Sequence, residues 1–146
     1  MNGPLAGVRI LDLTIWMQSF GTSMLGDMGA EVIKIESFPK GDPVRGMQEL
    51  RIGFDYAESP VNPLLQVTSR SKKSIAVDLH QPGARDVVYR LARECDVFAS
   101  NLRSRSLNQW GLDFPSLKAA NPRIIYVLDS GWGAKGPDKD AAGMDI

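Results

Sequence analysis

The chain has 146 residues, 43% of them hydrophobic and 23% charged, and its 17 basic residues balance 17 acidic ones. This composition is that of one globular domain, and it excludes a disordered chain and a surface charged for nucleic acid or an anionic membrane. The single Cys95 excludes an internal disulfide and a cysteine-rich zinc site. Its place between a helical and an apolar segment predicts a buried, inert thiol. No apolar run approaches the roughly 20 residues that span a bilayer, and no signal-peptide pattern precedes Val8, so we expect a cytoplasmic protein.

A strand–helix–strand unit is predicted over residues 8–36. The apolar run VRILDLT indicates the first strand, and EVIKIE, which alternates apolar and charged residues, indicates the second. Between them, apolar residues recur at helical spacing and should rest on a sheet: Trp16, Phe20, Met24, Leu25 and Met28. Gly29 should end this helix in the left-handed conformation. A unit of this kind is expected to be right-handed, with its two strands parallel.

Further elements follow a long irregular stretch, residues 37–71, which holds only a possible short helix at 62–68. Strands are predicted at 74–79, 96–100 and 123–130, and helices at 83–94, 107–110 and 114–120. Five strands separated mostly by helices predict an α/β fold with a parallel, doubly wound sheet. Irregular stretches as long as 37–71 are uncommon unless they bind a ligand or cover another subunit.

In such sheets ligands bind beyond the carboxyl ends of the strands, so the residues after each strand are the candidates for a site. No G-x-G-x-x-G follows the first strand and no Walker-type lysine loop occurs, which removes most support for nicotinamide or nucleoside triphosphate binding. Two clusters of cations are candidates for neutralising phosphates or, more simply, form solvated loops. They are Arg70, Lys72 and Lys73, and then Arg103 and Arg105.

Other single residues allow two interpretations. The lone His80 stands just past a strand end, where it is either a ligand contact or a structural residue. Asp12, Asp78 and Asp129 lie in or near strands, where a carboxylate serves function or braces a loop, and bracing is the simpler role. Three tryptophans, Trp16, Trp110 and Trp132, border predicted loops, where one could stack on a purine or pack in the core.

Several motifs in combination are more specific than any of these residues. PLAGVRILDLT, LGDMGAEVIKIE, GDPVRG, SKKSIAVDL, DVFASN, NPRIIYV and SGWGAKGP occur in this order at consistent spacings. Over essentially its whole length the chain resembles the amino-terminal part of the class III CoA-transferases, the superfamily of formyl-CoA transferase, carnitine CoA-transferase and α-methylacyl-CoA racemase.

The resemblance implies a Rossmann-like, doubly wound parallel sheet that binds CoA along its strand ends and is incomplete relative to the family's large domain. It implies an acyl-CoA and a carboxylic acid acceptor as substrates, with no metal. CoA would move between the acids through an aspartyl-CoA thioester, which is covalent catalysis by a carboxylate. Racemases of the superfamily instead move a proton next to the thioester carbonyl, and a fragment of such an enzyme remains an alternative.

Carried over residue by residue, the resemblance places CoA contacts after the strands and near the chain end. They are Met17, Gln18, Ser37, Val77, Asp78, Leu79, His80, Asn101, Leu102, Arg103, Gln109, Met144 and Asp145. The chain departs from the family pattern where Arg103 and Ser104 replace Gly-Pro, and Leu102 replaces an aromatic residue. Together with Arg105, this change adds positive charge where a phosphate could sit.

The family's nucleophilic aspartate lies beyond the segment Gly143-Met144-Asp145, so no catalytic residue is assigned in this chain. The resemblance implies that residues 1–146 are a CoA-binding domain without the family's small domain and carboxy-terminal return, and inactive alone. A non-catalytic truncated product is a further alternative. Helices packed on one side only, and the apolar residues Phe54, Tyr56, Leu64 and Leu65 in the long stretch, would leave apolar surface uncovered. We therefore expect a homo-oligomer, a dimer in the family.

Overall fold

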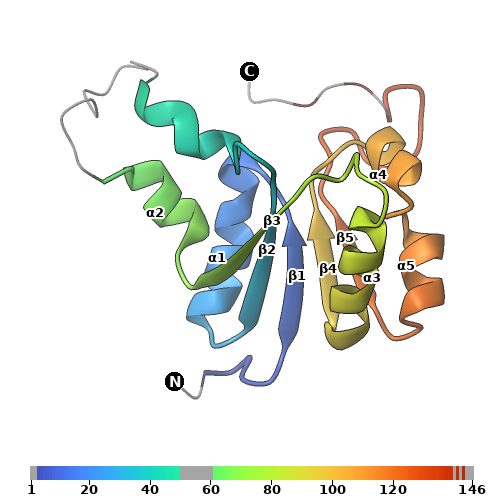
Figure 1. The fold of residues 1–146 in the computed structure, drawn as a ribbon, viewed down its shortest axis with the longest axis horizontal. Helices are drawn as coiled ribbons and strands as arrows, with labels where there is room; N and C mark the ends of the chain where they lie inside the picture. Colours follow the sequence, from blue (N-terminus) through green and yellow to red (C-terminus); the bar gives the residue numbers. More distant parts are fainter. Residues whose placement is uncertain (1–2, 50–60, 140, 142, 144–146) are drawn as a thin grey trace.

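A computed structural model describes residues 3–49, 61–139, 141 and 143. Within them, five parallel strands form one sheet in the order β3-β2-β1-β4-β5. The strands are β1 (Arg9–Leu13), β2 (Glu31–Ser37), β3 (Lys72–Val77), β4 (Val97–Ser100) and β5 (Ile125–Leu128). The α/β class and the parallel sheet are thereby confirmed. The order reverses beside β1, because β2 and β3 lie on one side of it and β4 and β5 on the other (Figure 1).

Helices cover both faces of the sheet. α1 (Ser19–Asp27) and α2 (Pro63–Ser69) lie on one face, and α3 (Ala84–Glu94), α4 (Ser104–Trp110) and α5 (Phe114–Ala120) on the other (Figure 1). The expectation that helices pack on one side only is therefore wrong. Two short 3-10 helices were not predicted: η1 (Trp16–Gln18) and η2 (Pro43–Glu49), the second within the stretch taken as irregular. Of the apolar residues expected to be uncovered there, Phe54 and Tyr56 lie outside the described residues.

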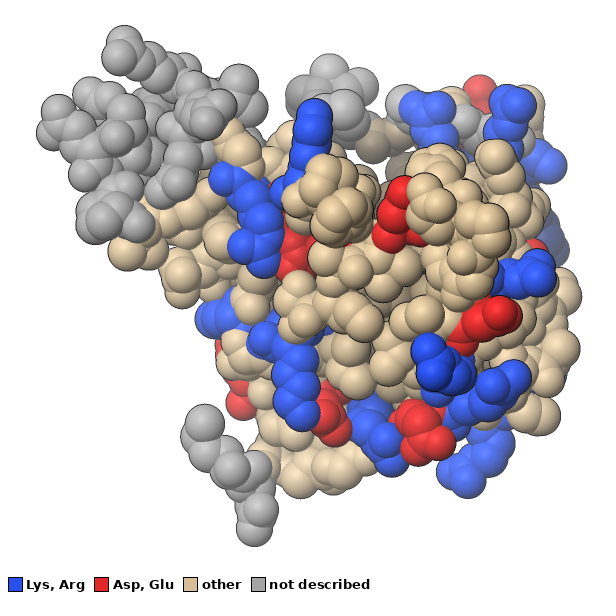
Figure 2. Space-filling model, viewed as in Figure 1, with Lys and Arg blue, Asp and Glu red and all other residues tan. Residues whose placement is uncertain are grey.

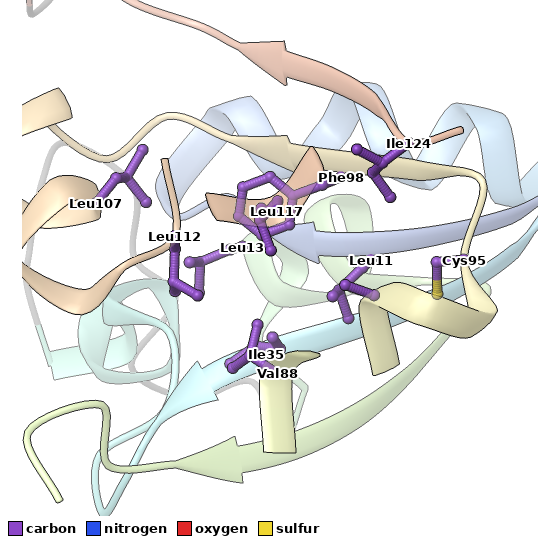
Figure 3. Packing of buried hydrophobic residues seen from close by; sticks show 11 residues of the cluster. Leu11, Leu13, Ile35, Val88, Cys95, Phe98, Leu107, Leu112, Leu117 and Ile124 are labelled. Atoms are coloured by element: carbon purple, nitrogen blue, oxygen red, sulfur yellow. The ribbon is translucent and has the colours of Figure 1, made fainter. Parts of the chain in front are cut away.

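The larger apolar core fills the space between the sheet and α3, α4 and α5. Leu11 and Leu13 of β1 point to this side because alternate residues of a strand face opposite ways. They meet side chains from the neighbouring strands and from the helices, including Ile35, Val88, Phe98, Leu107 and Leu117 (Figure 3). Cys95 lies in this cluster, and burial raises the pKa of its thiol to about 11, so the predicted inert cysteine fits the structure.

The opposite face of the sheet changes character along its strands. Near their amino ends, Ile10 and Val32 form a small apolar cluster with Ala30. Further along β1 and β2 the same face carries Asp12 and Lys34, and the side chain of Lys72, the first residue of β3, reaches across to Asp12. All three side chains are buried. Buried charges need polar partners, so the helix that covers them must supply polar atoms.

α1 supplies them, and its orientation is the reverse of the prediction. Its buried residues are Ser19, Thr22 and Ser23. The apolar stripe expected to face the sheet is exposed instead, apart from the partly buried Leu25, and comprises Trp16, Phe20, Met24 and Met28. Gly29 does follow the helix end as predicted, with φ of 101°. A Cβ there would lie 3.0 Å from Gly3 Cα, so both the conformation and the space favour glycine.

No helix among the described residues is long and apolar enough to cross a membrane. Figure 2 shows basic and acidic side chains interspersed around the rim of one face, whose middle is largely uncharged. This distribution agrees with the balanced charge of the sequence.

Candidate functional site

A cavity of about 370 Å³ opens at the carboxyl ends of β1, β2 and β3, and we call it the strand-end cavity. Its lining is mainly apolar, with Leu13, Ile35 and Val77 from the strand ends. Leu102 and Trp110 close it from the side of α4. Its position beside β1, where the strand order reverses, is the usual place for a ligand in an open parallel sheet.

A second space of about 370 Å³ lies next to it, at the ends of β1, β4 and β5, and we call it the polar cleft. Arg103, Asp129, Ser130 and Lys139 are among its lining residues. Ile15 and Leu102 line both spaces, so their side chains stand between the apolar cavity and the polar cleft. The strand ends therefore offer adjoining apolar and charged compartments.

Asn101 fixes the wall between the two compartments. Its Oδ1 accepts a hydrogen bond from the Ile15 N–H (2.8 Å), and its Nδ2 donates to the Ile15 carbonyl (3.1 Å). Both polar ends of the side chain are thus used on the backbone of one residue. The sequence placed Asn101 at a site because it follows a strand, but this pairing with Ile15 could not be read from that position.

The loop after β2 forms another wall through Lys40, Gly41 and Pro43. Glu36 anchors it, because its Oε2 accepts from the Asp42 N–H (2.9 Å) and from Arg45 Nε (2.6 Å). The Arg45 guanidinium, despite the opposing effect of burial, lowers the pKa of Glu36 to about 2.

Only glycine fits at position 41 of this loop. Gly41 has φ of 76°, in the region that L side chains rarely adopt. An added Cβ would lie 2.6 Å from Arg45 Cδ and 2.8 Å from Glu36 Oε2. The loop can therefore pass this close to the Glu36–Arg45 contact only because residue 41 has no side chain.

The loop after β3 presents His80, whose ring meets that of Trp110 edge to face with 5.6 Å between centroids. Asp78 braces this loop by accepting from the His80 N–H (3.0 Å) and from Gln81 Nε2 (3.0 Å). Both hydrogen bonds lower the pKa of Asp78, and the bond from Gln81 has the larger effect. Trp110 Nε1 is buried and has no hydrogen-bond partner among the described residues, so it remains a donor that a ligand could use.

The structure brings together many, but not all, of the residues expected at the site. Ser37, Val77, Leu79, His80 and Leu102 line the strand-end cavity. Asn101 and Arg103 line the polar cleft, while Arg105 and Gln109 line two further grooves beside α4.

The other expected residues lie elsewhere. Met17 and Gln18 are exposed and are not among the lining residues of these spaces. Met144 and Asp145 lie outside the described residues. Trp110, which the sequence left as a core or stacking residue, lines the strand-end cavity, and Lys139, which sequence reasoning missed, lines the cleft. Lys139 sits in a Gly-rich loop without a regular pattern that could have signalled it.

Each cation of the cluster of Arg70, Lys72 and Lys73 has a carboxylate partner. Lys72 is buried and paired with Asp12, while Lys73 pairs with Glu31 and Arg70 with Asp27. No group of residues suited to hold a metal ion occurs among the described residues.

An open parallel sheet with helices on both faces and a cavity beside the strand-order reversal defines a doubly wound α/β fold, in which ligands usually bind at this position. CoA-transferase family III matches residues 5–146, and the chain belongs to this family.

Among its curated relatives, the mouse succinyl-CoA:glutarate CoA-transferase is 41% identical over 143 residues, which cover 97% of this chain and 31% of the relative. The succinate–glutarate CoA-transferase of Agrobacterium fabrum is 36% identical over 97% of this chain and 36% of the relative. The succinyl-CoA–D-citramalate CoA-transferase of Chloroflexus aurantiacus is 39% identical, with 97% and 34% covered. The chain thus spans about a third of the length of these relatives.

Solved structures agree with this assignment. A CAIB/BAIF family protein from Brucella suis superposes with a TM-score of 0.85 at 36% identity, over 99% of this chain and 38% of that one. The hypothetical protein Rv3272 from Mycobacterium tuberculosis superposes with a TM-score of 0.83 at 32% identity, over 98% of this chain and 38% of that one.

Proposed function

We propose that residues 1–146 form the CoA-binding part of an acyl-CoA transferase. In this proposal CoA moves from an acyl-CoA to a carboxylic acid acceptor through an aspartyl-CoA thioester, with the nucleophilic aspartate outside these residues. The relatives act on succinate, glutarate or citramalate according to their names, which supports a short dicarboxylic acid as acceptor.

The observation that carries the proposal is the adjacency of the strand-end cavity and the polar cleft. CoA joins a flat adenine to anionic phosphates and a polar, flexible pantetheine arm. The apolar cavity suits the adenine, with Trp110 and His80 at its side. Lys40 at its edge, and Arg103 and Arg105 in the adjoining cleft and groove, suit the phosphates.

In this arrangement the chain's own residues bind and orient CoA. Asn101 holds Ile15, and Glu36 holds the loop of Gly41, so that the walls are in place before CoA arrives. A preorganised site loses less free energy in ordering on binding, which raises affinity.

The test is isothermal titration calorimetry of the 146-residue chain with CoA, adenosine and pantetheine. Adenosine should compete with CoA for one site, and pantetheine should bind far more weakly. Trp110→Ala should weaken both CoA and adenosine by roughly tenfold, because contact of a base with an aromatic ring is worth about 1–3 kcal/mol. Val67→Ala, at an exposed position on α2, is the matched control and should change neither.

The two parts of the proposal can fail separately. If CoA does not bind, this chain lacks the proposed function. If CoA binds but adenosine does not compete, the adenine lies elsewhere and only its placement is wrong.

We also propose that the protein self-associates and is cytoplasmic. The exposed apolar face of α1 supports association, since such a patch usually marks an interface. A single reduced cysteine suits a cytoplasmic compartment, where thiols stay free.

A further inference from the structure

Beneath the two loops that border the strand-end cavity lies a buried ion pair of Lys34 and Asp42. Lys34 Nζ is 2.8 Å from Asp42 Oδ2, and each side chain is 1% exposed. Lys34 donates its other two hydrogen bonds to the Thr14 carbonyl (2.7 Å) and to Ser19 Oγ (2.6 Å). An ammonium group has three donors, so this one is fully satisfied.

Asp42 connects the two loops. Its Oδ1 accepts from the Trp16 N–H (3.3 Å) in the turn after β1 and from the Val44 N–H (3.0 Å) in the loop after β2. Trp16 follows Ile15, and Val44 follows Pro43, and both of these preceding residues line the cavity. Oδ2 has no partner among the described residues other than the Lys34 ammonium. One carboxylate, held by one lysine, therefore fixes two of the segments that line the cavity.

Stability alone is a weak reason to keep such a pair. Two apolar side chains of similar volume avoid the desolvation cost of two buried charges and often stabilise a protein as well or better. They could not, however, accept hydrogen bonds from the amides of Trp16 and Val44. Trp16 also has φ of 61°, a costly conformation for a bulky residue that persists only when its surroundings enforce it.

We propose that Asp42 is a positioning residue for CoA binding. It holds the backbone amides of Trp16 and Val44, is itself held by Lys34, and thereby sets the width of the strand-end cavity. The inference rests on the proposed function for its ligand. The positions of the two loops, by contrast, can be tested without CoA.

The decisive variant is Lys34→Met/Asp42→Leu, which leaves no unpaired buried charge but removes the acceptor for both amides. We expect it to fold. Exchange of the Trp16 and Val44 amide protons, followed by NMR, should become at least about tenfold faster, and the Kd for CoA should rise about tenfold. Lys34→Met/Asp42→Asn keeps an acceptor oxygen and leaves no buried charge unpaired, so both changes should be smaller.

The matched control is Lys73→Met/Glu31→Gln, which removes an exposed lysine–carboxylate pair that joins β3 to β2. It should leave the CoA affinity and the exchange of both amides as in the wild type. A second measurement needs no variant: both amides should already be protected in the free wild-type protein, because the loops are positioned before CoA binds.

The outcomes separate the two proposals. A folded Lys34→Met/Asp42→Leu protein with wild-type CoA affinity shows that the pair is only structural and overturns the inference. Fast exchange of both amides in the free wild type also overturns it, whether or not the variant folds. If the wild type binds no CoA, the proposed function falls together with the claim about affinity, and the exchange rates still decide whether Asp42 holds the loops.

Discussion

Lys72 Nζ lies 2.8 Å from Asp12 Oδ2 beneath α1, and both side chains are buried. Lys72 also donates to the Ser19 carbonyl (2.6 Å) and to Thr22 Oγ1 (2.7 Å). Burial lowers the pKa of Lys72, and the Asp12 carboxylate opposes this effect. Because Lys34 contacts Ser19 Oγ, two lysines from neighbouring strands meet at the first residue of α1.

Replacing Lys72 should destabilise the protein strongly. Lys72→Met leaves Asp12 as an uncompensated buried charge, and the loss of one partner of such a pair costs about 3–5 kcal/mol. Urea unfolding followed by circular dichroism measures the difference. Lys73→Met, one position along the same strand in an exposed pair, should stay within about 0.5 kcal/mol of the wild type. Equal effects of the two substitutions would refute the special role of the Lys72–Asp12 pair.

Acid should remove the contribution of the Glu36 charge to the stability of the folded protein. Its pKa is about 2 in the folded protein against an ordinary value of 4.5, so the unfolded chain binds the proton first as pH falls. The stabilisation is complete above about pH 5 and is lost as pH falls toward 2. It amounts to at most about 3 kcal/mol, and to less where water screens the partly exposed Arg45.

The measurement compares the unfolding free energies of wild type and Glu36→Gln from pH 7 to pH 2.5. The wild type should be the more stable at pH 7, and the difference should shrink in acid because the unfolded chain binds the proton before the folded protein does. A difference that stays constant with pH would show that the charge of Glu36 contributes nothing.

Arg103 and Arg105 should act through the phosphates of CoA. We expect CoA to bind more tightly than dephospho-CoA or pantetheine, and its affinity to fall as salt rises. Arg103→Ala and Arg105→Ala should each weaken CoA and flatten the salt dependence. Arg90→Ala, on the solvated face of α3, serves as the control in the same calorimetry. Equal, salt-independent affinities for all three ligands would remove the phosphate role.

Cys95 should be unreactive until the protein unfolds. Its thiol is buried and its pKa is raised to about 11, chiefly by burial, so little thiolate forms near neutral pH. Alkylation by iodoacetamide at pH 8, followed by intact mass, should be slow in buffer and fast in 6 M urea. Rapid modification without denaturant would mean that the core around Cys95 opens readily.

The exposed apolar stripe of α1 should drive association. Phe20 and Met24 are among its residues. The guanidinium carbon of Arg70 lies over the Phe20 ring, 5.2 Å from the ring centroid. Phe20→Glu/Met24→Glu should lower the apparent mass in light scattering at high micromolar concentration. Gln66→Glu, at an exposed polar position on α2, adds charge without removing apolar surface and should have no effect. A wild-type protein that stays monomeric under these conditions would contradict the prediction.

The sheet was predictable because its strands carry continuous apolar runs and each helix–strand alternation is local in sequence. The orientation of α1 was not predictable in this way. Periodicity marks an apolar stripe but does not say which face of the sheet it meets, and the deciding charges come from three strands. Lys72 reaches the helix only because it pairs with Val32 in the sheet register, a contact between residues 40 positions apart.

The candidate site was predictable to the extent that it follows from strand ends. Ser37, His80 and Leu102 fall where the rule for parallel sheets places ligand contacts. Trp110 lines the cavity from the last position of α4, and no strand precedes it directly. The roles of Asn101 and Asp42 depend on which distant backbone amides they meet, and no local pattern encodes that choice.

The two faces of the sheet should also come apart differently. Exposing Leu11 and Phe98, in the core on the side of α3, to water costs free energy, whereas Asp12 and Lys34 beneath α1 regain hydration. Brief native-state openings should therefore lift α1 away well before α3, as a separate cooperative unit. A protease acting on the native protein should then cut first around α1, and the fragment containing β4 and α3 should survive longest.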